Sequence, residues 1–580
     1  MKIKRWFPLY AHLQTYHAKD WRKDVFAGII VAVMIIPQGM AYALLAGIPP
    51  IYGLYAGLVP LIIYGMFGTS GQLAIGPVAI SSILLLAGVS QLADPMSPEY
   101  ISLIILTGLL VGIFQAGLGF FRLGFLVNFI SQPVITGFTA AAAIIIFISQ
   151  IRNITGIPVP RFSYLFETIY YIGNHIREMN KMALAFCLIS IGLLIIIKKI
   201  NRALPGALIV VVLGIVFSWW LSQKGQLAGM RVVGEIPDGL PVFMLPVISI
   251  ENMMLLIPTV ITVGVMGVVE CIGIAKTIQR RHEESRIRPN MELIALGLSK
   301  IGGSFFQSLP TSGSFSRSAI NDEAGAKSGL SSITTGLVVG LTLLFFTKLF
   351  YYLPNAVLAA IIIFAIRNLF DYKEMQRLWK SHKSDFFMMA VTFITTLIFG
   401  IEKGVLVGVI LSMAIFIYRS SRPHLAVLGR LPNTRAYRNI ERFKDAHCPE
   451  DVLIVRLDYQ LYFANVIFFQ DAIQGICQRN RNLRLLILDA AGIHAIDSTG
   501  IRVLQELYFY FKKRNIHFVI SGAIGPVRDK LASSGTIEKM GPQSFFLEID
   551  DAMIHFGALT EDRQTTWSSD AVQTNYEEED

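Results

Sequence analysis

Long uncharged stretches dominate the first 420 residues of the chain. No Asp, Glu, Lys, Arg or His occurs from Val25 to Ala93. A helix needs about 17–25 apolar residues to cross the hydrocarbon core of a membrane. Further uncharged runs cover Tyr100–Phe121, Leu123–Ile151, Met182–Ile197, Asn252–Val269, Ser328–Thr347, Leu349–Ile366 and Gly404–Tyr418. Divided at Pro and Gly, these runs predict about fourteen membrane segments between residues 25 and 420.

Two of the predicted segments are too short to cross a membrane and are interrupted by small residues. Gly76 precedes a predicted short helix, Val78–Ala87, and Gly313 precedes a second one that ends at Asn321. A pair of interrupted segments in the two halves of a membrane chain is the best sequence indication of a transporter's binding site. The alternative is a pair of re-entrant loops that only pack against the protein.

The pattern changes near Arg419. Residues 421–448 predict a linker, and residues 449–558 predict strands alternating with helices, which is typical of a small α/β domain. Residues 1–24 are interpreted as a cytoplasmic N-terminal segment and residues 559–580 as an acidic, disordered tail. The predicted strands are Asp451–Asp458, Leu483–Asp489, His517–Ser521 and Phe545–Ile549, and the predicted helices are Ala464–Gln478, Thr499–Arg514 and Pro526–Ser534.

Composition and charge agree with a membrane protein. Only 16% of the 580 residues are charged, against about a quarter in soluble domains. The net charge is +10, and the Lys and Arg residues cluster at the ends of membrane segments. If the N-terminus is cytoplasmic, these ends all lie on the cytoplasmic side. This follows the positive-inside rule and does not indicate nucleic-acid binding. The loop with Arg152, Arg161 and Arg177 is the exception, since it falls outside.

The starts of the two short helices suit a small anion. The first turn of a helix leaves N–H groups without partners and carries about half a positive charge. Two such ends facing each other would hold an anion without needing a buried cation. Val78–Ser82 and Ser314–Ser318 fit this description, because their small residues allow close approach and their hydroxyls add donors.

Glu270 and Arg317 are candidate functional residues inside the membrane. Glu270 ends the uncharged run Asn252–Val269, and Arg317 lies in the second short helix. Ionisable residues in membrane segments are rare and usually functional. A Glu270–Arg317 pair would lower the cost of burying both, and protonation of Glu270 would free Arg317 for an anion. The alternative is that Glu270 lies near the cytoplasmic end and extends to the interface. Glu292 is interpreted as interfacial or structural.

The sequence argues against several other functions. No Gly-Lys dipeptide occurs, so a Walker A loop is absent and ATP-driven transport is not expected. The four cysteines show no disulfide-like or metal-binding spacing, and neither a cofactor nor a metal is expected. An enzyme is the least supported class, because no catalytic set is evident. The cysteines are Cys187, Cys271, Cys448 and Cys477.

The segment Asp497-Ser498-Thr499-Gly500 lies between a predicted strand and a predicted helix. Asp and Ser are favoured at the residue that caps a helix start. The simpler interpretation is therefore a helix cap. The alternative is a regulatory or docking loop at an exposed helix start.

Several motifs resemble those of the SulP anion transporters, and the C-terminal domain resembles a STAS domain. The STAS loop matches Asp497–Gly500. The likeness covers the chain from Trp21 to about Ala558. The membrane motifs are Pro37–Ala43, Gly47–Tyr55, Gly68–Ser70 with Ile75–Pro77, Asn290–Gly297 and Gly313–Ser318.

The resemblance implies an α-helical membrane protein with two inverted repeats of seven segments, two half-helices, a core and a gate domain, and an elevator-like movement. It also implies a homodimer in the plasma (inner) membrane, with both termini in the cytoplasm. The family's coupling carboxylate maps onto Glu270. Its substrate contacts map onto Gln38, Tyr42, Val78, Ala79, Ser314, Phe315, Ser316 and Arg317.

We therefore expect a secondary active transporter for a small inorganic anion, sulfate first, driven by proton symport or anion exchange. A bicarbonate or C4-dicarboxylate transporter, with proton or Na⁺ coupling, is the main alternative. An anion channel and a nucleobase carrier are others, although a nucleobase carrier would not need a STAS domain. Besides the lipid bilayer, a cytoplasmic protein that binds the STAS domain is an expected partner.

Overall fold

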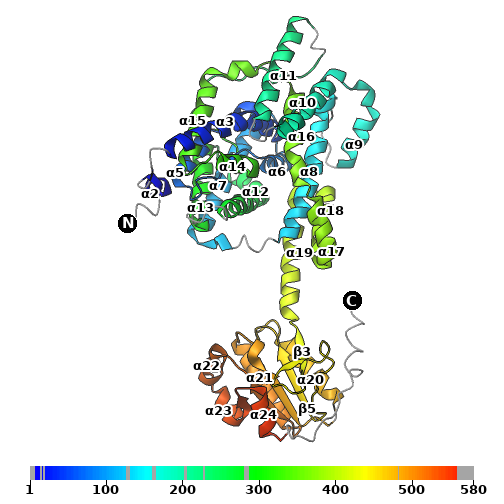
Figure 1. Cartoon of the computed structure of the whole chain (residues 1–580). Coiled ribbons are helices and arrows are strands. Elements are labelled where there is room, and N and C mark those ends of the chain that lie inside the picture. Colours follow the sequence, from blue (N-terminus) through cyan, green and yellow to red (C-terminus); the bar gives the residue numbers. More distant parts are fainter. Residues whose placement is uncertain are drawn as a thin grey trace. The chain divides into compact units, whose positions relative to one another are not determined.

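A computed structural model describes residues 7–13, 16, 20–125, 131–157, 159, 165–200, 205–225, 229–279, 287–480 and 482–557. It divides into two units, Met1–Ser412 and Met413–Asp580. The first unit is helical apart from one short strand pair, and the second contains a six-stranded sheet (Figure 1).

Eight stretches of the described chain are long and apolar enough to cross a membrane. Many apolar side chains on the later ones are exposed, among them Leu188, Phe217 and Phe416. In a bilayer such faces meet lipid, where helices are stable because their backbone polar groups are paired internally. The eight are α3 (Asp20–Leu45), α4 (Pro50–Tyr55) together with α5 (Val59–Phe67), α7 (Pro98–Phe120), α8 (Gln132–Thr155), α10 (Lys181–Ile200), α11 (Gly206–Gln223), α12 (Ile250–Gln279) and α19 (Ile401–Ser421).

Shorter helices complete the first unit. The mainly apolar ones are α6 (Ala79–Val89), α13 (Pro289–Ser304), α15 (Leu330–Phe345), α16 (Asn355–Ile366) and α18 (Lys383–Phe399). The others are α2 (Pro8–Leu13), α9 (Leu165–Asn174), α14 (Phe315–Glu323) and α17 (Tyr372–Ser381), with 3-10 turns η2 (Ile176–Glu178), η3 (Thr347–Phe350) and η4 (Arg367–Leu369).

The helices of the first unit pack in two groups. In one group, α13 contacts both α5 and α7, α12 lies along α7, and α3 contacts α4 and α15. In the other, α8 packs against α16 and α18, and α10 packs against α11 and α16. Glycines allow the closest approaches between helices. A Cβ on Gly329, which precedes α15, would lie 1.9 Å from the carbonyl oxygen of Gly65 on α5.

A buried antiparallel strand pair belongs to the first group. Strand β1 (Ile75–Gly76) pairs with β2 (Ser312–Gly313), and all four residues are buried. Helix α6 begins three residues after β1 ends, and α14 begins two residues after β2 ends. The two short helices predicted from the sequence are therefore present, and both start from one strand pair.

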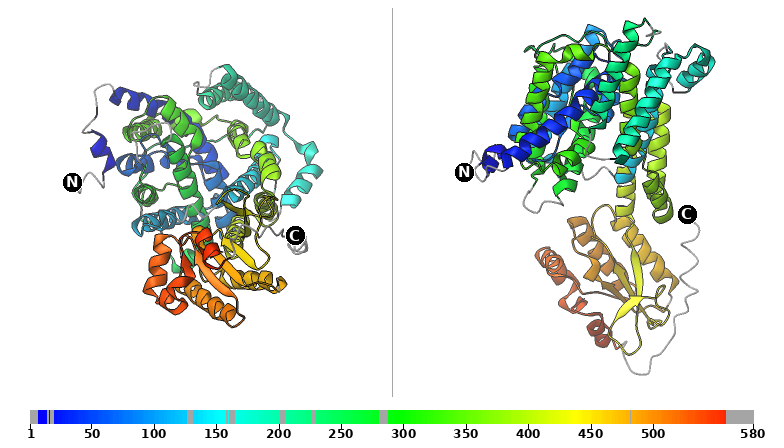
Figure 2. Two further views of the ribbon diagram at one scale, coloured as in Figure 1. Left: turned by 60° about the horizontal axis from the view of Figure 1, so that its bottom comes forward. Right: turned by 45° about the horizontal axis from the view of Figure 1, so that its top comes forward.

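The second unit is a mixed sheet flanked by helices (Figure 2). Its strand order is β4-β3-β5-β6-β7-β8. Strand β3 (Leu425–Arg430) is antiparallel to both β4 (Tyr437–Asn439) and β5 (Val452–Leu457), and the remaining pairs are parallel. The other strands are β6 (Leu485–Asp489), β7 (His517–Ser521) and β8 (Phe545–Phe546).

Helices on both sides of the sheet form its two apolar cores. Strand β6 is buried at all five residues, as expected for a parallel strand covered on both faces. The helices are α20 (Val466–Arg479), α21 (Ser498–Lys512), α22 (Gly525–Ser533), α23 (Thr536–Met540) and α24 (Ile549–His555), with 3-10 turns η5 (Ala490–Gly492) and η6 (Pro542–Ser544).

The predicted linker at residues 421–448 is instead part of this sheet. Strands β3 and β4 form within it, and β3 pairs with β5 from Leu425 to Val427. Ala426 and Leu428 are buried, so this short apolar stretch belongs to the core despite its basic surroundings. The predicted tail, 559–580, lies outside the described residues, and the segment 1–24 is described only in part.

Candidate functional site

Hydrogen bonds across the strand pair hold the starts of α6 and α14 together. The backbone N of Ser314 donates to Ala74 O at 3.1 Å, and Ala74 N donates to Ser318 Oγ at 2.9 Å. Asn321 Nδ2 donates to Gln72 O at 3.0 Å. Non-helical backbone at membrane depth is stable only where the protein satisfies its polar groups. These bonds therefore fix the position of both helix starts.

Arg317 places a buried guanidinium at this crossing. It lies on α14 with 0% of its surface exposed, and its Nη1 donates to Gln38 Oε1 on α3 at 3.0 Å. Within the described residues, its Nε and Nη2 atoms have no hydrogen-bond partner. A Cβ on Gly76 would lie 3.1 Å from Nη2, so the backbone of β1 runs close beside the guanidinium. These donors match an oxyanion, which the guanidinium fork binds in bidentate fashion.

Four predicted contact residues lie around this guanidinium or at the start of α6. Gln38 and Tyr42, one turn apart on α3, are both buried. Gln38 accepts the Arg317 hydrogen bond, and Tyr42 interacts with Arg317 electrostatically. Val78 caps α6 and Ala79 is the first residue of that helix, and both are buried. The structure thus assembles one polar group from α3 and α14 beside the start of α6.

The three residues before Arg317 differ in exposure. Ser314 caps α14, where its Oγ accepts from Arg317 N at 3.5 Å and lies 3.3 Å from Ser316 Oγ. Ser316 is exposed, and Phe315 is 59% exposed. The two hydroxyls therefore lie at an accessible helix start. The Phe315 side chain does not join the buried group around Arg317.

Glu270 is placed beside β2 and not in a direct ion pair with Arg317. Its Oε2 accepts from Ser312 Oγ at 2.8 Å, and the neighbouring Cys271 Sγ accepts from Gly313 N at 2.9 Å. The carboxylate is part-buried on α12. Glu270 and Arg317 still interact electrostatically. Helix α12 is thus hydrogen-bonded to the strand from which α14 starts.

Two buried carboxylates hold the loops next to the short helices. Glu292 on α13 accepts from Thr69 N at 2.8 Å, from the Thr69 hydroxyl and from the Tyr64 hydroxyl. Asp24 on α3 accepts from Lys327 N and from Ser328 Oγ, each at 2.6 Å. Of the two interpretations of Glu292, interfacial or structural, these hydrogen bonds favour a structural role. Sequence reasoning missed Asp24, whose only signal was its place at the edge of the first uncharged run.

In the second unit, Asp497 caps α21. Its Oδ1 accepts from Gly500 N at 2.8 Å, and its Oδ2 accepts from Phe463 N at 2.9 Å. Ser498 and Thr499 begin the helix. The structure thus shows the predicted helix cap, which also ties the loop before α20 to the start of α21.

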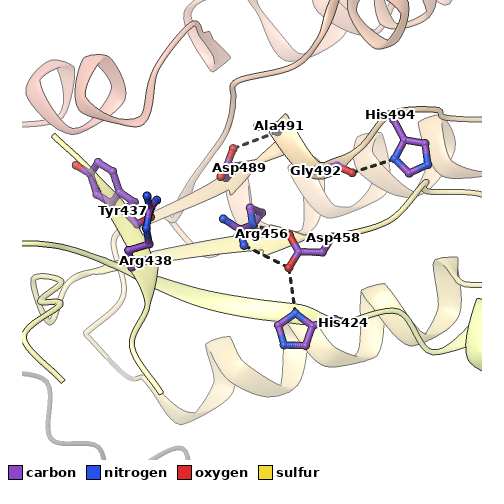
Figure 3. Close-up of polar contacts among 9 residues, drawn as sticks. All are labelled: His424, Tyr437, Arg438, Arg456, Asp458, Asp489, Ala491, Gly492 and His494. Carbon is purple, nitrogen blue, oxygen red and sulfur yellow. Dashed lines mark hydrogen bonds and ion pairs between the residues drawn. The ribbon is translucent and has the colours of Figure 1, made fainter. Parts of the chain in front are cut away.

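A polar cluster lies at the end of β5 (Figure 3). Asp458 accepts from Arg456 and from His424, whose Nδ1 lies 3.1 Å from Asp458 Oδ2. Burial alone would raise the pKa of Asp458, but the hydrogen bonds from Arg456 and His424 lower it below its usual value. On the neighbouring β6, burial raises the pKa of Asp489, whose Oδ1 accepts from Ala491 N. These contacts join the start of β3 to the end of β5.

Membrane-crossing helices, a buried strand pair that joins the starts of two short helices, and two guanidinium donors without a hydrogen-bond partner among the described residues are the features expected of a multi-pass membrane transporter. The chain belongs to the sulfate permease family, whose model matches residues 21–392. Residues 444–552 match the STAS domain. These matches confirm the SulP and STAS resemblances.

The chain is similar to plant sulfate transporters along most of its length. It is 39% identical over 572 residues to sulfate transporter 4.1, chloroplastic, of Arabidopsis thaliana, covering 95% of this chain and 83% of that one. It is 33% identical over 575 residues to high affinity sulfate transporter 2 of Stylosanthes hamata, covering 96% and 87%. These relatives are transporters, which confirms that the chain does not belong to an enzyme family.

Two solved structures share the fold. The murine solute carrier 26 family member A9 anion transporter, in its inward-facing state, has a TM-score of 0.89 at 28% identity, covering 96% of this chain and 95% of that one. The transmembrane domain of the cyanobacterium bicarbonate transporter BicA has a TM-score of 0.58 at 23% identity, covering 68% and 98%. At that identity the second likeness shows the fold alone.

Proposed function

We propose that this chain is a secondary active transporter that carries sulfate together with protons. The observation that supports this most directly is a pair of buried Arg317 donors beside β1, Nε and Nη2, which have no hydrogen-bond partner among the residues that the structure describes. Sulfate presents several oxygens to such a fork, and the starts of α6 and α14 add positive dipole ends. The plant relatives are named as sulfate transporters, which favours sulfate over other oxyanions.

Glu270 is the proposed coupling group. It interacts electrostatically with Arg317 and accepts a hydrogen bond from Ser312 beside it. While ionised, it competes with an anion for the positive field of Arg317, and protonation removes that competition. Proton symport follows if sulfate binds best when Glu270 is protonated. Anion exchange and Na⁺ coupling are the alternatives at this position.

The wider architecture is part of the same proposal. The α3–α7 and α12–α15 segments would form a core, and α8–α11 with α16, α18 and α19 a gate, in two inverted repeats that make about fourteen segments. The core would move against the gate in an elevator-like manner. We further propose a homodimer in the plasma (inner) membrane, with cytoplasmic termini and a protein partner at the STAS loop Asp497–Gly500.

The test is radiolabelled sulfate uptake into proteoliposomes with an imposed inward proton gradient. We expect the gradient to stimulate uptake by the unmodified chain and by Glu251→Gln, an exposed carboxylate at the start of the same helix α12. We expect Glu270→Gln to show no stimulation, because the coupling carboxylate is gone. Competition by bicarbonate, malate and uracil in the same assay separates the other candidate substrates.

The outcomes separate the parts of the proposal. If the rate of sulfate uptake is the same with and without the proton gradient, and the same in Glu270→Gln, proton coupling is contradicted while sulfate transport still holds. Stimulation by a Na⁺ gradient in place of the proton gradient would identify Na⁺ as the coupling ion. No sulfate uptake, with strong uptake of bicarbonate or malate, would overturn the choice of substrate.

A further inference from the structure

The buried face of helix α14, which carries Arg317, is polar. All nine residues of this helix are described, and the buried ones are Arg317, Ser318 and Asn321. Most helices bury an apolar face, and its packing fixes their position. Because α14 has no such face, hydrogen bonds decide where it lies, and with it where the guanidinium lies.

Two side chains of α14 bond to the segment that precedes β1. Ser318 Oγ accepts from Ala74 N at 2.9 Å, and Asn321 Nδ2 donates to Gln72 O at 3.0 Å. Ser318 and Asn321 are three residues apart, and Arg317 precedes Asn321 by four. Residues at these spacings lie on one face of a helix. The bonds therefore act on the face from which Arg317 extends.

Asn321 connects α14 to two further parts of the chain. Its Oδ1 accepts from the hydroxyl of Ser331 on α15, and its backbone O accepts from Ala326 N at 3.0 Å. Gln72 Nε2 donates in return to Ala326 O at 3.2 Å. An amide suits this position because it offers a donor and an acceptor at once. The end of α14 is thus bonded both to the chain before β1 and to α15.

These contacts form a closed circuit with the helix that holds the guanidinium's acceptor. On α15, Thr335 Oγ1 donates to Gly28 O of α3 at 3.0 Å. Further along α3, Gln38 Oε1 accepts from Arg317 Nη1 at 3.0 Å. The circuit runs from α3 through α15 and Asn321 to α14, and returns to α3 through Arg317. It therefore limits how far α14 can shift relative to α3.

The direction of the remaining guanidinium donors depends on this restraint. Nη1 is bonded to Gln38, while Nε and Nη2 have no hydrogen-bond partner among the described residues. A Cβ on Gly76 would lie 3.1 Å from Nη2, so β1 bounds the space beside it. An oxyanion bound by such a fork needs both N–H groups aimed at its oxygens, at about 2.7–2.9 Å. A displaced α14 would keep the positive charge and lose this alignment.

We propose that Asn321 is a positioning residue that holds the Arg317 fork in the direction an oxyanion requires. The inference rests on the proposed function and adds a residue to its site. Asn321 acts through Arg317 and does not touch the anion, because its amide is bonded to Gln72 and Ser331. The effects of Asn321 and Arg317 on sulfate affinity are therefore coupled, and a double-mutant cycle measures such coupling.

The test measures the Kd for sulfate by titration calorimetry on purified full-length protein. Asn321→Leu has a similar shape and lacks both the donor and the acceptor of the amide. We expect it to raise the Kd by about tenfold, comparable to the loss of one hydrogen bond to a charged group. In an Arg317→Lys background there is no fork to align. There we expect Asn321→Leu to change the Kd by less than about twofold.

A purely structural role of Asn321 predicts a different result. Poorer folding would lower the fraction of protein that binds sulfate, which calorimetry reports as the stoichiometry, in both backgrounds alike. An unchanged Kd in Asn321→Leu, or equal changes with Arg317 and with Arg317→Lys, would overturn the inference. Asn174→Leu, at the exposed end of α9, is the control and should leave the Kd unchanged in both backgrounds.

A second variant covers the case in which Asn321→Leu does not yield folded protein. Gln72→Ala removes the bond to Ala326 O from the opposite side of the same contact. We expect it to raise the Kd by about threefold, and to have no effect in the Arg317→Lys background. Equal effects of Gln72→Ala in the two backgrounds contradict the inference.

Sulfate uptake by the unmodified chain separates this inference from the proposed function. If the cycle shows the expected coupling but proteoliposomes take up no sulfate, the proposed transport fails and the positioning role stands. If sulfate is taken up but the cycle shows no coupling, only the positioning role fails. If the unmodified chain binds no sulfate, both are overturned.

Discussion

At the residue scale, the most informative side chain is Arg317, because two of its donors have no partner in the described part of the chain. We expect Arg317→Ala to raise the sulfate concentration for half-maximal uptake by about 10–100-fold, the effect of losing charge-assisted hydrogen bonds. The half-saturating concentration of Arg317→Lys should lie between those of the unmodified chain and Arg317→Ala, since lysine keeps the positive charge but lacks the paired N–H donors of the guanidinium.

The Arg317 prediction is checked by radiolabelled sulfate uptake at several concentrations. Arg377→Ala on α17 is the matched control, because that arginine is exposed and pairs only with Glu374 in its own helix among the described residues. An unchanged half-saturation concentration for Arg317→Ala would remove Arg317 from the site.

Asp458 gives a pH prediction in the second unit. Its pKa is lower in the folded chain than the usual value of about 3.9. A carboxylate of this kind stabilises the fold fully above its unfolded pKa, and the contribution is lost as the pH falls through the lower, folded pKa. Because the Asp458 side chain is 32% exposed, we expect Asp458→Asn to destabilise the second unit by only about 0.5–1 kcal/mol at pH 7.

Hydrogen exchange of the β5 amides in the full chain measures this difference. Exchange in Asp458→Asn should be about 2–5-fold faster at pH 7, converted from that free energy. The difference should shrink near pH 3. Asp529→Asn on the exposed face of α22 is the control. Equal exchange rates in Asp458→Asn and the unmodified chain at pH 7 would contradict the assigned contribution.

At the scale of elements, close helix crossings limit what the first unit tolerates. A Cβ on Gly329 would meet the backbone of Gly65 at 1.9 Å, and backbone atoms cannot move aside as a side chain can. We expect Gly329→Ala to destabilise the first unit by about 1–3 kcal/mol, the range for overpacking. Thermal unfolding of the purified protein in detergent measures this.

Gly192 provides the control for that experiment. It lies within α10, and nothing lies within 4 Å of a Cβ built on it. Gly192→Ala should therefore leave the unfolding temperature unchanged or raise it slightly, since alanine is the better helix former. Equal effects of the two substitutions would show that the α5–α15 crossing is not the cause.

The elements themselves were largely predictable from the sequence. Uncharged runs predicted the long helices, and Gly76 and Gly313 predicted the two short ones, because apolar length and small residues are local properties. Strands β3 and β4 were missed, since short stretches among basic residues become strands only through pairing, of β3 with β5 and of β4 with β3. Such pairing is a property of the fold and not of the segment.

The site was predictable only in part, for a related reason. Motif resemblance located Gln38 and Arg317, and the structure joins them. It could not reveal that Glu270 bonds to Ser312 rather than to Arg317, because that choice depends on how α12 lies against β2.

At the scale of the whole molecule, the orientation of the chain in the membrane can be tested with two surface lysines on either side of helix α16. Lys348 lies before α16 and Lys373 after it. If α16 crosses the membrane, they lie on opposite sides, and the basic residues around Lys373 should be cytoplasmic. In intact cells we expect Lys348→Cys to react with a membrane-impermeant maleimide and Lys373→Cys to react only after permeabilisation.

The native cysteines make this labelling experiment practical. All four are buried, so the unmodified chain should give little background. Labelling of Lys373→Cys from outside, with Lys348→Cys protected, would reverse the proposed orientation. Labelling of both from the same side would show that α16 does not cross.

The pairing of β1 with β2 also has a consequence for biosynthesis. During synthesis, Gly76 leaves the ribosome 237 residues before Gly313, and until then β1 has no partner for its backbone groups. Unpaired backbone of this kind is unstable in lipid. The backbone polar groups of β1 must therefore be kept away from lipid until β2 has been synthesised. Anion binding at the proposed site should accordingly appear only when translation has passed α14, which makes it a reporter of the pairing of β1 with β2.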